Sequence, residues 1–495
     1  MSGTDLRIRL GQRLGVGFDG PVIPDEFVRL VKEYKVGNVI LFKRNVHSRE
    51  QLTKLCADLR QLIRAETGFE PFIMIDEECG SVSRLGHIAG ETPSAMAIGA
   101  TGDPENARTV GRIVGERLRA VGVNLDLAPV LDCFTNQDNT VCGNRCFSSD
   151  PETVGRFGVA YTEGLQTTGV LACGKHFPGH GDTAVDSHLA LPTIRKPMEA
   201  IRETELKPFE AAIRGGIASI MTTHILFPAL DPEVPATVSR RIMTGLLREE
   251  LGFEGLIVSD AIEMKAVLNL FGIPDGTLRA LNAGVDIALI CHSPADGAAA
   301  MEYLESAVRD GRLSEENIQA GYQRVVGRKK LLPETAPSSE GFGTPEQQAA
   351  AERIMEAGIR LLHAPEGQAL PAVGAQTVVF GTKGRRNALV NDDIVFDAAR
   401  AFTEAYGGRY MEQPPEDTPD TALVFIGRHP EADQTVNAAI RLAERGTKVI
   451  AVSLFTPTCL RPLPDSVWKI AAWQYDSLAV RALAGWLAKK FRKTD

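Results

Sequence analysis

The stretch GLIVSDAIEM (255–264) indicates the architecture of the larger part of this 495-residue chain. A run of four apolar residues leads directly into Ser259 and Asp260. An unbroken apolar run is typical of a parallel strand buried on both faces, whereas a strand with one solvated face alternates. The chain contains eight such runs, at residues 14–20, 36–42, 71–78, 123–130, 171–179, 217–225, 255–260 and 283–291.

Helical patterns separate these runs. Between residues 49 and 68, for example, leucines at 52, 55 and 59 and Ile63 recur at the three- and four-residue spacing of one buried helix face. Eight strands alternating with helices favour a (β/α)8 TIM-type barrel over a doubly wound sheet. Such barrels carry their active sites at the carboxyl ends of the strands, so polar residues there are candidate functional residues.

Composition predicts a second domain. We assign residues 1–332 to the barrel, 333–347 to a linker and 348–495 to a smaller α/β sandwich domain. The segment after Lys330 is rich in Pro, Gly, Ser and Thr, which is typical of a linker. The last part contains neither a P-loop nor a G-x-G-x-x-G pattern, so we expect no nucleotide site there. Its apolar runs lie at residues 377–381, 422–427, 448–455 and 469–475.

The net charge of the chain argues against a nucleic-acid or membrane partner. The formal net charge is -9 and no long Lys/Arg cluster occurs, so neither a nucleic acid nor a membrane is expected. The N-terminus lacks the apolar core of a signal peptide, and no run approaches the roughly 18 apolar residues of a membrane span. These features predict a soluble, cytoplasmic protein that acts on a small molecule, and they do not indicate its oligomeric state.

The eight cysteines follow no framework spacing, so we expect reduced thiols rather than disulfides. Cys142 and Cys146 form a C-x3-C pair without a second pair nearby, which is too few ligands for an expected zinc site. We therefore expect no metal and no cofactor.

The segment KHFPGHGDTAVDSH (175–188) is unusually dense in titratable groups. Its glycines and proline exclude a regular helix and predict a long loop after the fifth strand. Lys175 and His176 are expected at the strand end. Asp186 lies two residues before His188 and can orient its imidazole, which makes His188 a candidate general acid/base.

Other interpretations of these residues stay open. Asp260, at the end of the seventh run, could act as nucleophile, base or metal ligand, or could only cap a helix. His180 is expected to structure its own loop. A metallohydrolase would use ligands from the same loop, although barrel metal sites gather ligands from several strand ends. Its candidate ligands are His176, His180, Asp182, Asp186 and His188.

Together, these segments resemble the family 3 glycoside hydrolases, and within them the β-N-acetylglucosaminidase branch. The resemblance runs along the whole barrel and continues into the second domain, which looks like the α/β sandwich of longer members. It is carried by KHFPGHGDTAVDSHLALP (175–192), LIVSDAIEM (256–264), IDEECGSVSRL (75–85), GNRCFSSDP (143–151), GQRLGVGFDG (11–20) and residues 448–487.

The resemblance implies a retaining glycosidase of exo action. It would release terminal β-linked GlcNAc from saccharides such as cell-wall fragments in peptidoglycan recycling. Asp260 matches the nucleophile that forms a covalent glycosyl-enzyme, and His188 with Asp186 matches the acid/base dyad of this branch. The residues that match sugar-hydroxyl contacts are Asp76, Arg145, Lys175 and His176, with Arg84 as a supporting contact.

Two residues depart from the family pattern near the expected sugar pocket. Cys79 precedes Gly80 where the family usually has two glycines, and Cys146 stands where a serine is common. A β-glycosidase of altered sugar preference therefore stays open. So does a phosphorylase using the same residues, because a neutral imidazole would not repel an incoming phosphate. A catalytically silent sugar-binding protein is the remaining alternative.

Overall fold

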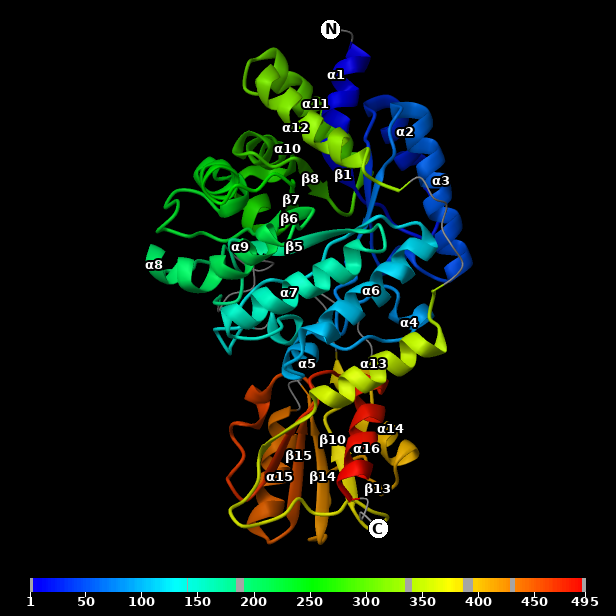
Figure 1. Cartoon of the computed structure of the whole chain (residues 1–495), viewed down its shortest axis with the longest axis vertical. Coiled ribbons are helices and arrows are strands. Elements are labelled where there is room, and N and C mark those ends of the chain that lie inside the picture. The colour runs from blue at the N-terminus through cyan, green and yellow to red at the C-terminus, as the bar shows by residue number, and fades with distance from the viewer. Residues whose placement is uncertain are drawn as a thin grey trace.

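The computed structural model describes residues 3–139, 141–183, 191–333, 341–385, 395–427 and 432–491. They form two parts that follow one another along the long axis of the molecule (Figure 1). The first is a barrel surrounded by helices, and the second is a smaller sheet domain that carries the last helix, α16. Two residues of the expected acid/base dyad, Asp186 and His188, lie outside the described residues.

Eight parallel strands close into a barrel in chain order, which confirms the TIM-type fold. Each strand falls on one of the eight apolar runs. The strands are β1 (Leu14–Val16), β2 (Asn38–Leu41), β3 (Phe72–Ile75), β4 (Leu125–Asp126), β5 (Leu171–Phe177), β6 (Ser219–Thr222), β7 (Leu256–Ala261) and β8 (Ile287–Ile290).

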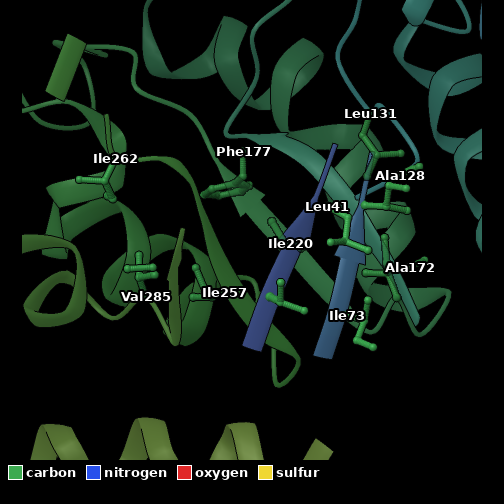
Figure 2. Close-up of a cluster of buried hydrophobic side chains, with 14 of the residues drawn as sticks. Leu41, Ile73, Ala128, Leu131, Ala172, Phe177, Ile220, Ile257, Ile262 and Val285 are labelled. Atoms are coloured by element: carbon green, nitrogen blue, oxygen red, sulfur yellow. The ribbon is translucent and has the colours of Figure 1, made fainter. Parts of the chain in front are cut away.

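Burial on both faces explains the unbroken runs. In β3, Phe72 and Met74 point into a cluster that fills the barrel, while Ile73 and Ile75 belong to the larger cluster under the surrounding helices. Residues of this outer cluster line several strands in turn, as Ile73, Ala172 and Ile257 illustrate (Figure 2). Successive side chains of one strand thus enter two different cores, and neither face requires polar residues.

The helices lie outside the barrel strands (Figure 1). Helix α3 shows why they begin and end where they do: the Ser48 hydroxyl accepts a hydrogen bond from the Gln51 amide at 3.2 Å, and Gly68 at φ +78° ends the helix. The α-helices are α1 (Gly3–Gly11), α2 (Asp25–Tyr34), α3 (Arg49–Thr67), α4 (Gly86–Ala89), α5 (Ala95–Ala100), α6 (Pro104–Val121), α7 (Pro151–Gln166), α8 (Met198–Ile201), α9 (Lys207–Arg214), α10 (Lys265–Ala283), α11 (Pro294–Arg309) and α12 (Glu315–Lys329). Helices of other types complete this part. The 3-10 helices are η1 (Lys43–Asn45), η2 (Gly143–Arg145) and η4 (Ala236–Val238), and the π-helices are η3 (Arg202–Leu206) and η5 (Arg241–Glu250).

The second domain is built on a six-stranded sheet in the order β13-β10-β14-β15-β16-β9. Its strands are parallel except β9, which runs antiparallel to β16. The strands are β9 (Arg360–His363), β10 (Val378–Gly381), β13 (Arg409–Tyr410), β14 (Thr421–Ile426), β15 (Lys448–Ser453) and β16 (Trp468–Ala471), beside a hairpin of β11 (Gly384–Arg385) and β12 (Val395–Phe396). Its helices are α13 (Pro345–Gly358), α14 (Ala398–Ala405), α15 (Ala432–Glu444), η6 (Pro457–Leu460) and α16 (Ser477–Phe491).

Four of these strands fall on the predicted apolar runs, whereas β9 and β13 were not predicted. Strand β9 is half exposed, and β13 has only two residues, so neither produces an apolar run. Among the described helices, none combines the length and apolar character that crossing a membrane requires.

Candidate active site

The candidate residues gather at the carboxyl ends of the barrel strands, as the fold predicts. Asp76 directly follows β3, Lys175 and His176 lie in the last part of β5, and Asp260 lies near the end of β7. Arg145 closes the short turn η2 in the loop after β4. Four different strand ends thus contribute charged side chains to one end of the barrel.

A buried ionic cluster joins β3, β5 and η2. The Lys175 ammonium lies 2.6 Å from Asp76 Oδ1 and 2.5 Å from Glu78 Oε1. Arg145 donates two hydrogen bonds to Glu78, from Nε to Oε2 and from Nη2 to Oε1, both at 2.7 Å. Arg84 approaches Asp76 from the other side, with Nη2 3.7 Å from Oδ2. Three predicted sugar-contact residues, Lys175, Arg145 and Arg84, therefore pair with the carboxylates of Glu78 and Asp76.

The cluster stays charged although it is buried. Burial alone would raise the pKa of Glu78, but the charges of Arg145 and Lys175 hold it well below its usual value. Burial likewise lowers the pKa of Lys175, and Asp76 and Glu78 reverse that effect and raise it. Arg145 also donates from Nη1 to the Val141 carbonyl at 3.1 Å. Two of its five N–H groups then have no partner among the described residues and can meet hydroxyls of a ligand.

His176 is oriented by Asp132, a fully buried carboxylate after β4. Nδ1 of His176 lies 2.7 Å from Asp132 Oδ2, and the backbone amides of His176 and His180 donate to Oδ1 at 3.2 and 2.7 Å. Burial raises the pKa of Asp132, but the His176 charge and hydrogen bond bring it below its ordinary value. The same carboxylate therefore anchors the start of the loop after β5 through the amides of His176 and His180.

The end of β7 is held by a hydroxyl and imidazole network. The Asp260 amide donates to Thr222 Oγ1 at 3.4 Å, and His224 Nε2 donates to the Ala261 carbonyl at 2.8 Å. Thr237 Oγ1 lies 2.7 Å from both Thr222 Oγ1 and His224 Nδ1. The backbone is thereby held at the Asp260 amide by Thr222 of β6 and at the Ala261 carbonyl by His224, which follows β6.

Asp260 is not a helix cap. The next helix, α10, begins at Lys265 with Met264 as its N-cap, and Asp260 Oδ1 accepts a hydrogen bond from the Ala261 amide at 2.8 Å. Asp76 directly follows β3 and Asp260 lies near the end of β7, so the two carboxylates lie at the same end of the closed parallel barrel. Burial and the charges of Glu263, Asp260 and Asp76 raise the pKa of the Cys291 thiol, after β8, well above its ordinary value.

The two cysteines that depart from the family pattern are buried. Cys79 is 4% exposed, packs in the outer barrel core and has a φ of +74°, a conformation that favours glycine. Cys146 is fully buried and packs in a core that joins the two domains. Among the described residues, no group of three or more His, Cys, Asp or Glu side chains is arranged to hold a metal ion.

The structure adds four residues to the candidate set: Glu78, Asp132, His224 and Glu263. All four lie in segments that follow barrel strands, which is where the fold places active-site residues. Their roles depend on partners far away in the chain. Glu263 lies in the turn after β7, accepts a hydrogen bond from the Cys291 amide, and burial raises its pKa to about 7.

The chain is similar to known proteins over most of its barrel. Residues 6–327 match the family described as "Glycosyl hydrolase family 3 N terminal domain". A beta-hexosaminidase A from Pseudoalteromonas piscicida is 35% identical over 339 residues, 64% of this chain and 57% of that protein. A beta-hexosaminidase from Thioalkalivibrio sulfidiphilus is 37% identical over 293 residues, 58% of this chain and 82% of that protein. The chain thus spans little more than half of the Pseudoalteromonas relative.

A solved structure matches both domains. The family 3 β-N-acetylglucosaminidase from Paenibacillus sp. str. FPU-7 is 32% identical and superposes with a TM-score of 0.89, covering 98% of this chain and 97% of that one.

Proposed function

Because the chain belongs to family 3 of the glycosyl hydrolases, we propose that it is a retaining exo-β-N-acetylglucosaminidase. Its substrate is a small saccharide with a terminal β-linked GlcNAc, such as a cell-wall-derived fragment. The observation that carries the proposal is that Asp260 on β7, Lys175 on β5 and its ion-pair partner Asp76 directly after β3 lie at the carboxyl ends of strands of one closed barrel. The proposed nucleophile and the proposed sugar-binding cluster are thus at the same end of the barrel.

The cluster around Glu78 supports recognition of a terminal sugar. Lys175 and Arg145 are held by Glu78 and Asp76, yet each keeps N–H groups for ring hydroxyls. His176 is fixed through Nδ1 by Asp132, which directs Nε2 away from that carboxylate. Preorganised donors of this kind bind without reorientation at the moment of reaction.

The reaction proceeds in two balanced steps. The Asp260 carboxylate forms a bond to the anomeric carbon while the bond to the leaving oxygen breaks, and His188 gives that oxygen its proton. Water then attacks the same carbon, His188 takes its proton, and Asp260 leaves. Asp186 orients the imidazole. In this assignment an imidazole replaces one of the two carboxyl groups that most such enzymes use.

The test is turnover of an aryl β-N-acetylglucosaminide beside the matching aryl β-glucoside, each with and without millimolar phosphate. We expect preference for the N-acetylated sugar and release of free GlcNAc with retained configuration, unchanged by phosphate. GlcNAc-1-phosphate as the product would replace the hydrolase with a phosphorylase. Preference for the glucoside would refute the assigned sugar, and cleavage of neither substrate would refute the activity.

A further inference from the structure

A short segment of the second domain, Trp473–Asp476 after β16, reaches the loops at the barrel mouth. Trp473 is 7% exposed and has a φ of +59°. For a residue with a side chain this conformation costs energy and persists only where the surroundings hold it. Its indole Nε1 donates to the Gly358 carbonyl at 2.6 Å, so the ring is anchored at the end of α13. The main chain of Trp473 is left facing the barrel.

The Trp473 carbonyl is bound by two barrel side chains. Asn144 Nδ2 donates to it at 2.8 Å and Ser94 Oγ at 3.2 Å. The neighbouring Gln474 accepts from the Ser94 amide at 2.6 Å and donates to the Thr92 carbonyl at 3.1 Å. The segment therefore clamps two separate barrel loops, the one after β3 and the one after β4.

Asn144 is the residue that links this clamp to the ionic cluster. It is 1% exposed, stands next to Arg145 in η2, and also donates to Ser81 Oγ at 2.9 Å. Ser81 lies three residues after Glu78 in the loop that follows β3. One amide thus ties together the loops that carry the two members of the Arg145–Glu78 ion pair, and the Trp473 carbonyl holds that amide.

A second contact from the same domain bears on the same turn. Gly143, at φ +47°, begins η2, and a Cβ built on it would lie 2.5 Å from Cζ of Phe455. The Phe455 ring therefore rests directly on the turn that carries Arg145. This contact is apolar and comes from a different loop of the second domain, so it is independent of the hydrogen bonds of Trp473.

We propose that the second domain is a positioning element of the sugar site. The Trp473 carbonyl and the Phe455 ring fix the turn η2, and through it they set where the two remaining N–H groups of Arg145 meet the terminal sugar. The inference rests on the proposed function of Arg145 as a sugar contact. A displaced donor loses its hydrogen bond to a ligand hydroxyl, so the position of the turn determines the affinity for the sugar.

The experiment uses the full-length protein and the variants Phe455→Ala and Asn144→Ala. We expect KM for the aryl N-acetylglucosaminide and the dissociation constant of free GlcNAc, measured by calorimetry, to rise together by about fivefold to tenfold. The value of kcat should stay within about twofold of wild type, because Asp260 and its network lie on other strands.

Two matched variants separate positioning from general loss of structure. Ser477→Ala removes a different contact between the domains, the 2.7 Å hydrogen bond to Glu91, and should lower the melting temperature without changing KM or GlcNAc affinity. Ser81→Ala removes the other partner of Asn144 but keeps the bond to Trp473, so it should change affinity less than Asn144→Ala. If Phe455→Ala does not fold, Phe455→Leu replaces it.

Unchanged KM and GlcNAc affinity in folded Phe455 and Asn144 variants would overturn the positioning role while leaving the hydrolase intact. An equal loss of GlcNAc affinity in Ser477→Ala would also overturn it, because any weakening of the contact between the two domains would then explain the loss. A wild type that binds GlcNAc but does not turn over the substrate refutes the proposed function only. A wild type that does not bind GlcNAc refutes both.

Discussion

Arg145 and Glu78 form a bidentate ion pair whose side chains are only 8% and 3% exposed. Lys175 contacts the same carboxylate and also Asp76, so two carboxylates compensate two buried cations. A buried pair of this kind adds little stability compared with apolar residues, but removal of one member leaves an uncompensated charge. The pair therefore serves to hold the two cations in place for a ligand.

Glu78→Gln should reduce both stability and activity. We expect the free energy of unfolding to fall by about 3 to 5 kcal/mol, because Arg145 and Lys175 lose their shared charge in the interior. The exposed pair of Lys54 and Asp58 is the control, and Asp58→Asn should change stability by less than about 0.5 kcal/mol. Urea unfolding measures both effects, and equal small changes would contradict the role of Glu78.

The same carboxylate has a defined pH dependence. The pKa of Glu78 in the folded protein lies below its ordinary value of 4.5, so its stabilisation is complete above pH 4.5 and is lost as the pH falls further. Wild type should lose more free energy of unfolding than Glu78→Gln between pH 5 and the lowest pH at which both are folded. Parallel losses in the two proteins would exclude Glu78 as the titrating group.

Asp260→Ala should abolish turnover while the melting temperature stays near that of wild type. Sodium azide can enter the space left by the carboxylate and attack an activated aryl glycoside from the same face. We expect partial recovery of rate with the α-configured glycosyl azide as product, identified by NMR. Substantial activity without azide, or a β-configured azide, would contradict the role of nucleophile.

His188→Ala should act selectively on substrates with poor leaving groups, because only these need protonation. We expect kcat/KM to fall by about 10² to 10⁴ for an alkyl or disaccharide substrate and far less for a nitrophenyl glycoside. Asp186→Asn should show the same pattern more weakly, since it disturbs only the orientation of the imidazole. Equal losses on both substrates would contradict an acid role.

The barrel could be predicted because each of its strands is buried on both faces. Phe72, Ile73, Met74 and Ile75 are all apolar since alternate residues enter two different cores, and this leaves an unbroken run in the sequence. The half-exposed β9 (Arg360–His363) shows the limit of the same signal. There, pairing with β16 decides the strand, and the pattern of residues does not.

The site could be predicted in part for a related reason. Strand ends mark where charged residues gather, but they do not say which residues pair. Glu78 and Arg145 are 67 positions apart, and the bond between Asn144 and Trp473 joins residues 329 positions apart in different domains. Such pairs form where loops of separate elements meet in the fold, and the sequence does not show which loops meet.

Glu263→Gln should stabilise the protein selectively at higher pH. Burial raises the pKa of this carboxyl to about 7, above its ordinary 4.5, so its ionisation opposes folding as the pH rises from 4.5 through 7. Relative to wild type, the variant should gain roughly 1 to 3 kcal/mol of unfolding free energy between pH 5 and pH 8. Glu254→Gln, at an exposed position before β7, is the control, and the same gain in both variants would contradict the assignment.

Thr237→Val should lower kcat without weakening substrate binding. The Thr237 hydroxyl joins Thr222, which holds the Asp260 amide, to His224, which holds the Ala261 carbonyl. Its loss lets the nucleophile depart from the line of attack, and we expect kcat to fall by about 10- to 100-fold with KM within about twofold. Steady-state kinetics on the aryl N-acetylglucosaminide measure both constants.

The control for this variant is Thr277→Val. Thr277 is also fully buried, and its hydroxyl donates to the Ile273 carbonyl within α10 at 2.8 Å, away from the Asp260 network. Both substitutions delete one buried hydroxyl at constant shape and should cost similar stability, about 1 kcal/mol. Only Thr237→Val should change kcat. If the two variants lose stability equally and keep the same kcat, the network supports the fold of β6 and β7 and has no part in placing Asp260.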